Sequence, residues 1–124
     1  MKSPATGPCK TREDYADVLG KSVHCVMDRP LGSAHPRHPE MIYPVNYGFV
    51  PGIIAGDGAE QDVYVLGPAV PVEEFDGVVI AVIHRLDDCE DKWVVAEKAG
   101  VYTADEIMQS VYFQEQYFTV EIVM

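Results

Sequence analysis

The sequence predicts an α+β fold that is mainly β, a small barrel closed by a single C-terminal helix. Two observations lead to this prediction. Short runs rich in β-branched and aromatic residues recur along most of the chain, and the one long helical pattern comes last. With 124 residues, of which 48% are hydrophobic, the chain is long enough to bury one core without disulfides and is not typical of disordered proteins.

Four apolar runs predict the strands, because β-branched and aromatic residues suit a half-buried pleated surface. They are residues 22–30 (SVHCVMDRP, stopped by Pro30), 63–67 (VYVLG), 77–86 (GVVIAVIHRL) and the end of 86–96 (LDDCEDKWVVA). Pro, Gly, His and Asp mark the connections. They predict a loop, an irregular aromatic-rich segment and a turn at residues 31–41, 43–52 (YPVNYGFVPG) and 57–62 (DGAEQD), respectively.

The helix is expected over residues 103–118, in TADEIMQSVYFQEQYF. Thr103 is placed as its N-cap with Glu106 three residues later, which is the capping-box pattern. Apolar side chains then recur at helical spacing, at Ile107, Met108, Val111, Tyr112 and Phe118. Near the other end of the chain, residues 12–20 predict a short helix or arm, so we expect an arm at residues 1–20 and a barrel domain at 21–124.

The net charge of −11 excludes a broad basic surface for nucleic acid, since neutralising phosphates takes clustered Lys and Arg. The negative charge does not exclude a small phosphate ligand, because divalent cations can lie between carboxylates and phosphate oxygens. The three cysteines, Cys9, Cys25 and Cys89, have neither metal-type nor disulfide-type spacing. With no signal-peptide pattern and no membrane-spanning segment in the sequence, we expect a soluble protein of the reducing cytoplasm, without membrane association.

Two acidic turns stand beside apolar strands and are candidates for metal binding. Strand ends that meet on one rim of a barrel would bring their carboxylates together, and hard cations prefer oxygen ligands. The candidates are Asp57, Glu60, Asp62, Asp87, Asp88 and Glu90, with Asp91 a seventh. The alternative is that these acids only form turns, which favour Asp for backbone reasons. The four histidines lack zinc-type spacing, and a solvated loop explains His35 and His38.

The order of these blocks resembles the family I soluble inorganic pyrophosphatases. The segment YPVNYGF matches the family's Tyr-Pro-x-Asn-Tyr-Gly pattern, and it is followed by DGAEQDVYVLG, by DKWVVA and by VYFQEQYF, over residues 22–118. The resemblance implies a five-stranded, OB-like closed barrel with a helix. It also implies Mg²⁺ as cofactor, attack of water on bound pyrophosphate, and association into homo-oligomers. Burial of apolar surface between copies would also stabilise so small an acidic subunit.

Site residues follow from the resemblance by position. Tyr47 and Lys92 correspond to a catalytic tyrosine and a phosphate-binding lysine, and Tyr117 to the phosphate-binding tyrosine of the helix, with Tyr43 near Tyr47. Asn46 is expected to hold its loop rather than to touch substrate. The implied metal ligands are Asp57 and Asp62 in the first turn, with Asp87, Asp88 and Glu90 as candidates in the second.

The sequence departs from the family at two of these positions. Ala59 stands where the family has the carboxylate that helps to deprotonate water, and the adjacent Glu60 is the candidate to replace it. Phe118 stands where the family has a lysine after the tyrosine.

The segment VMDRPLGSAHPR allows two alignments with the family. In the preferred one, Asp28 is a metal-side acid and Arg37 binds phosphate, and the hairpin carrying the family's arginine is deleted. In the other, Asp28 and Arg29 are the family's Asp-Arg pair itself.

The sequence therefore predicts a Mg²⁺-dependent hydrolase that cleaves pyrophosphate to two phosphates. Two alternatives stay open: a hydrolase of another phosphorylated small molecule on the same scaffold, and a non-catalytic OB-like binding module.

Overall fold

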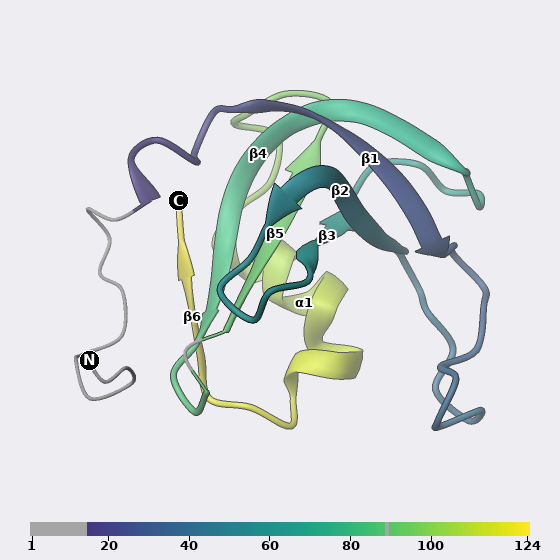
Figure 1. The fold of residues 1–124 in the computed structure, drawn as a ribbon. Coiled ribbons are helices and arrows are strands. Elements are labelled where there is room, and N and C mark those ends of the chain that lie inside the picture. The colour runs from purple at the N-terminus through teal and green to yellow at the C-terminus, as the bar shows by residue number, and fades with distance from the viewer. Residues whose placement is uncertain (1–14, 89) are drawn as a thin grey trace.

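The computed structural model describes residues 15–88 and 90–124. Within these residues, six strands and one helix follow each other (Figure 1). They are β1 (Ser22–Arg29), β2 (Asn46–Ile54), β3 (Glu60–Val65), β4 (Glu74–Arg85), β5 (Asp91–Ala96), α1 (Ala104–Glu115) and β6 (Val120–Val123). In Figure 1 the strands curve around one side of the molecule, and α1 lies in the concavity beneath them. No helix of the described part of the chain is long and apolar enough to cross a membrane.

The first five strands form a closed barrel, as the sequence predicts. They pair in the order β1-β2-β3-β5-β4, and the pairing of β4 with β1 closes the ring. The β3–β5 pair is parallel and the other four pairs are antiparallel. The last strand, β6, pairs with the end of β4 outside the ring. Closure leaves the ring without free edges.

Two hydrophobic clusters hold the fold together, one on each face of the strands. Val63 and Val65 belong to the cluster inside the barrel, whereas Tyr64 and Leu66 belong to the cluster under α1. This alternation follows from the period of two along a strand. The second cluster positions the site, because it fixes the end of α1 against β2, β3 and β4.

The helix has the cap that the sequence predicts. The Thr103 side chain accepts a hydrogen bond from the Glu106 backbone, and the Glu106 side chain accepts one from the Thr103 backbone. Ile107 and Val111 are buried as expected, but Tyr112 is 56% exposed. Phe118 lies beyond the helix, which ends at Glu115.

The irregular structure predicted for residues 43–52 is wrong, since most of this segment is β2. Gly48 explains why a strand fits here: a Cβ at this position would lie 2.0 Å from the Val26 carbonyl oxygen of β1. Glycine therefore permits the close approach of β1 and β2. Asn46 holds its loops as expected, because its side chain accepts from the Leu31 and Val72 amides and donates to the Val70 carbonyl.

Two strand boundaries and one additional strand also differ from the prediction. The strand β3 begins at Glu60, within the predicted turn, and β4 begins at Glu74. The short β6 has no counterpart in the prediction. Each extension lies where pairing with a neighbouring strand, rather than local composition, decides the structure.

The described part of the predicted helix or arm leads into β1: Tyr15 has 3₁₀-helical geometry and residues 16–20 form a turn. Tyr15 is buried, and its hydroxyl donates to Asp91 Oδ1 at 2.7 Å. The Gly20 amide donates to the Val79 carbonyl. Residues 1–14 lie outside the described residues, so the division into an arm at 1–20 and a barrel domain at 21–124 stays a prediction.

Candidate active site

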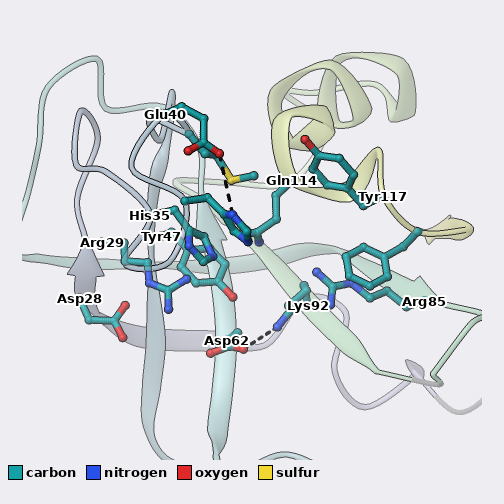
Figure 2. A pocket seen from close by; sticks show the side chains of 13 residues that line it. Asp28, Arg29, His35, Glu40, Tyr47, Asp62, Arg85, Lys92, Gln114 and Tyr117 are labelled. Atoms are coloured by element: carbon teal, nitrogen blue, oxygen red, sulfur yellow. Dashed lines mark hydrogen bonds and ion pairs between the residues drawn. The ribbon is translucent and has the colours of Figure 1, made fainter.

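A cavity of about 590 Å³ lies between the strands β1–β5 and the end of α1. Figure 2 shows Asp28 and Arg29 on one side, Arg85 and Tyr117 on the other, and Tyr47, Asp62 and Lys92 between them. The full lining is Asp28, Arg29, His35, His38, Glu40, Met41, Tyr47, Asp62, Arg85, Lys92, Gln114, Tyr117 and Phe118. It brings together five of the residues chosen from the sequence: Asp28, Tyr47, Asp62, Lys92 and Tyr117.

Lys92 is a cation of the cavity that two carboxylates hold in place. It lies at the start of β5, where its ammonium group donates to Asp62 Oδ2 at 2.6 Å and lies 2.8 Å from Glu90 Oε1. Burial favours the neutral amine, but Tyr47 and the hydrogen bonds to Asp62 and Glu90 outweigh burial and raise the pKa of Lys92. Lys92 is therefore a permanent cation on the cavity wall.

Tyr47 forms part of the cavity floor and is 5% exposed. Burial raises the pKa of its hydroxyl well above the ordinary value, so Tyr47 stays protonated and can donate a hydrogen bond. Two cations lie near its ring, Arg29 at 5.6 Å and Lys92 at 6.0 Å from the centroid. Tyr43 packs beside it but is fully buried and does not line the cavity.

Of the two arginines that the alternative alignments offer, Arg29 lines the cavity and Arg37 does not. Arg29 ends β1, donates from Nη1 to the Tyr43 hydroxyl at 2.6 Å and lines the cavity. Arg37 is exposed in the loop before β2 and does not line the cavity. Arg29 is the arginine that the second alignment of the sequence uses, in the Asp-Arg pair, whereas the first alignment uses Arg37.

The candidate metal ligands separate into two groups. Asp28 and Asp62 line the cavity described above. Desolvation and the nearby negative charge of Asp62 raise the pKa of Asp28, although Arg29 opposes them. Asp57, Asp88 and Glu90 line a second cavity of about 380 Å³ at the barrel end near Tyr15.

Two of the turn acids make local hydrogen bonds: Asp57 accepts from the Ala59 amide and Asp88 from the Glu90 amide. These bonds are typical of Asp in turns, which is the alternative that the sequence left open. Asp87 lines neither cavity and accepts from the Thr119 amide, 32 positions away. Glu60 is exposed and accepts from the Gly52 amide at 3.0 Å, and it does not line the cavity either.

Within residues 15–88 and 90–124, no three Asp, Glu, His or Cys side chains are grouped to hold a metal ion. The donor set of the cavity nonetheless fits Mg²⁺. This ion usually takes one or two carboxylates and completes its shell with waters and substrate phosphates. Asp28 and Asp62 are two such carboxylates on the wall of the cavity that carries the cations.

Two arginines of the cavity were missed as first choices from the sequence, Arg29 and Arg85. The signal for Arg29 was the second alignment of the segment around Asp28. Arg85 gave no sequence signal, because it ends a strand predicted as core. Gln114, which lies near the end of α1, also gave no sequence signal.

The comparison with protein families gives a match to inorganic pyrophosphatase over residues 20–116. Among curated proteins, the inorganic pyrophosphatase of Aeropyrum pernix is 38% identical over 53 residues, which cover 41% of this chain and 30% of that protein. The inorganic pyrophosphatase of Caulobacter vibrioides is 52% identical over 31 residues, covering 25% of this chain and 18% of that protein. The aligned segments thus span less than a third of either relative.

Solved structures share the fold. The inorganic pyrophosphatase of Ehrlichia chaffeensis superimposes with a TM-score of 0.63 at 19% identity, over 83% of this chain and 85% of that chain. That of Neisseria gonorrhoeae gives a TM-score of 0.61 at 21% identity, over 84% and 81% of the two chains. The family match covers well over half of the sequence, and the barrel with its C-terminal helix agrees with these structures. The chain belongs to the inorganic pyrophosphatase family.

Proposed function

We propose that this protein hydrolyses inorganic pyrophosphate to two phosphates, with Mg²⁺ as cofactor. The observation that carries the proposal is the composition of the cavity wall. Among the described residues, it combines three permanent cations with two carboxylates. The cations are Arg29, Arg85 and Lys92, and the carboxylates are Asp28 and Asp62. Phosphoryl transfer asks a protein mainly to position the phosphates and to stabilise their charge.

The residues of the chain have separate tasks in this proposal. Lys92 and Arg29 neutralise phosphate oxygens, and Tyr47, protonated because it is buried, donates a hydrogen bond to one of them. Tyr117 is 68% exposed at the mouth of the cavity, where its hydroxyl can reach a phosphate that enters. These groups keep the substrate in place and draw negative charge toward the leaving phosphate.

Asp28 and Asp62 would hold Mg²⁺ together with the substrate. When bound, Mg²⁺ offsets phosphate charge and lowers the pKa of a coordinated water. The remaining acids chosen from the sequence, Asp57, Asp87, Asp88 and Glu90, do not line this cavity, and a metal role for them rests on the acidic turns of the sequence and on the resemblance.

A phosphate-release assay with MgCl₂ tests the proposal. We expect release from pyrophosphate that stops when EDTA removes the metal, and a loss of at least about tenfold in Lys92→Met, because a charged hydrogen-bond donor is removed. Lys98→Met is the matched control, since Lys98 is exposed and lines a different cavity. Release from another phosphate ester or anhydride, but not from pyrophosphate, would mean another substrate. No release from any such compound would mean a binding module.

We also propose that the protein works in the cytoplasm as a homo-oligomer. The support is the family, together with exposed apolar side chains such as Ile42, Ile54 and Val70 that a second copy could cover. Sedimentation at micromolar concentration tests the assembly, and a monomer alone would contradict it.

A further inference from the structure

A line of hydrogen bonds starts with a partly buried bond at Arg29 and continues through buried bonds along the cavity. Arg29 donates to the Tyr43 hydroxyl at 2.6 Å, and this hydroxyl donates to Gln114 Oε1 at 2.9 Å. Tyr43 is fully buried and Gln114 is 9% exposed. Arg29 is therefore connected through the Tyr43 hydroxyl to Gln114, which lies near the end of α1.

The line continues from Gln114 to the opposite wall. Gln114 Nε2 donates to the Tyr64 hydroxyl at 2.6 Å, and this hydroxyl donates to Glu115 Oε2 at 2.6 Å. Glu115, which is 1% exposed, accepts two bonds from Arg85, from Nε at 2.9 Å and from Nη2 at 2.8 Å. Each hydroxyl accepts one bond and donates the next, so the directions are consistent from one arginine to the other.

Arg85 is held in place by its ion pair with Glu115 and by an aromatic ring. Its guanidinium is stacked on Phe118, with Cζ 3.7 Å from the ring centroid. Arg85 is 6% exposed, and it lines the cavity. Nη1 makes a long contact of 3.5 Å with Glu90 Oε1, so its two N–H groups retain donor capacity for an oxyanion.

We propose that Arg85 is a phosphate-binding residue of this cavity, contacting a substrate oxygen through Nη1, and that Glu115 is its positioning residue. The inference rests on the proposed function, because it assumes that a phosphate anion enters the cavity. A guanidinium fixed through two of its nitrogens loses little freedom when the third binds an anion. Phe118, at the position where the resembled family has a lysine, covers the guanidinium from which the charge now comes.

Binding of imidodiphosphate, a pyrophosphate analogue with a P–N–P bridge, tests the inference by calorimetry on the full chain in MgCl₂. The variant is Arg85→Met with Glu115→Gln, because removing the arginine alone would leave a buried carboxylate without its cation. We expect binding weaker by about 10- to 100-fold, as for a lost hydrogen bond to a charged group. Lys98→Met controls for the loss of a positive charge elsewhere.

A second variant separates charge from packing. Arg85→Lys with Glu115→Gln keeps a cation at the wall, so it should bind within about tenfold of the unmodified protein. Circular dichroism checks the fold of each variant. If the methionine variant does not fold, Arg85→Gln with Glu115→Gln replaces it, since two amides can hydrogen-bond each other.

The outcomes distinguish this inference from the proposed function. If the unmodified protein binds imidodiphosphate and the folded methionine or glutamine variant binds it as tightly, Arg85 is not a ligand and the inference is wrong, while the proposed function stands. Equal weakening in the lysine and methionine variants would show a packing effect and would also overturn it. If the unmodified protein neither binds the analogue nor releases phosphate, both are wrong.

Discussion

The ammonium group of Lys92 lies 2.6 Å from the carboxylate of Asp62, and the same group is 2.8 Å from Glu90. One lysine thus joins carboxylates from the two acidic turns of the sequence. Asp62 is also the acid of the first turn that lines the cavity. Its carboxylate therefore both orients Lys92 and is available to a cation that enters with the substrate.

Asp62→Asn should reduce phosphate release from pyrophosphate by about 10- to 100-fold and raise the Mg²⁺ concentration needed for half-maximal rate. The substitution removes one charge at nearly constant volume, and the hydrogen bond between two ions becomes a weaker one between the Lys92 ammonium and a neutral amide. Rates measured against MgCl₂ concentration test this, with the exposed Asp17→Asn as control. An unchanged Mg²⁺ dependence would mean that Asp62 acts only as a turn and strand residue.

Tyr64→Phe should destabilise the fold by about 1–3 kcal/mol, because it removes a fully buried hydroxyl that bonds both Gln114 and Glu115. Urea denaturation gives the free energy of unfolding. Tyr112→Phe is the matched control, since Tyr112 is on the same helix as these partners but is 56% exposed. Equal stability of the two variants would show that the buried line contributes nothing to the fold.

Gly48→Ala should destabilise the protein by at least about 3 kcal/mol or prevent folding, because a Cβ 2.0 Å from the Val26 carbonyl forces two backbones apart. Gly56→Ala is the control, since a Cβ there meets no atom within 4 Å. Thermal unfolding of both variants provides the comparison. A Gly48 variant as stable as the Gly56 variant would mean that β1 and β2 can separate at little cost.

The sequence predicts best what local interactions decide. The capping box at Thr103 places the start of α1 correctly, since its hydrogen bonds join residues three apart. The strand β2 was missed because Gly48, Pro51 and Gly52 are signals of irregular structure, and pairing with two neighbouring strands outweighs them.

The same distinction between local and long-range interactions applies to the residues of the candidate site. Tyr47 and Lys92 could be chosen because short motifs carry them. Arg85 could not be chosen from the sequence, because its neighbours Glu115 and Phe118 are about thirty positions away. They meet Arg85 only because α1 and the segment after it pack against β4. The choice between Arg29 and Arg37 also depended on which of them faces the cavity, a question that alignment of one segment leaves open.

The stability should depend on pH through His24, on the surface where β1 pairs with β4. Its ring lies 2.6 Å from Asp76 and 2.8 Å from Glu74, and the hydrogen bond to Asp76, with help from Glu74, raises the pKa of His24 despite some desolvation. A raised pKa means that the folded state binds the proton more tightly than the unfolded state. The stabilisation is full below the unfolded pKa of about 6.5 and disappears as pH rises through the raised folded value.

His24→Asn should therefore lower the melting temperature at pH 5.5 and leave it unchanged at pH 8.5. Because the three side chains are exposed, salt should screen the effect. Melting curves at both pH values, with and without about 1 M NaCl, test this. A difference between variant and unmodified protein that is the same at both pH values would assign the effect to packing instead.

The last prediction concerns Glu60, which the sequence suggests as the general base in place of Ala59. Glu60 is exposed at the start of β3, accepts a hydrogen bond from the Gly52 amide at 3.0 Å and does not line the cavity. From this position we expect Glu60→Gln to leave the rate of phosphate release unchanged, since a general base must come within hydrogen-bond reach of the proton it takes. Rates with saturating pyrophosphate and MgCl₂ give the comparison. A loss of about 10²–10⁴-fold would instead assign Glu60 as the base and require the turn at residues 57–62 to move into the cavity with substrate.

Ala59→Asp distinguishes the two situations further. If the turn stays outside the cavity, a carboxylate at position 59 should not change the rate, whereas a faster Ala59→Asp variant would show that the turn reaches the substrate and that the native protein lacks its base.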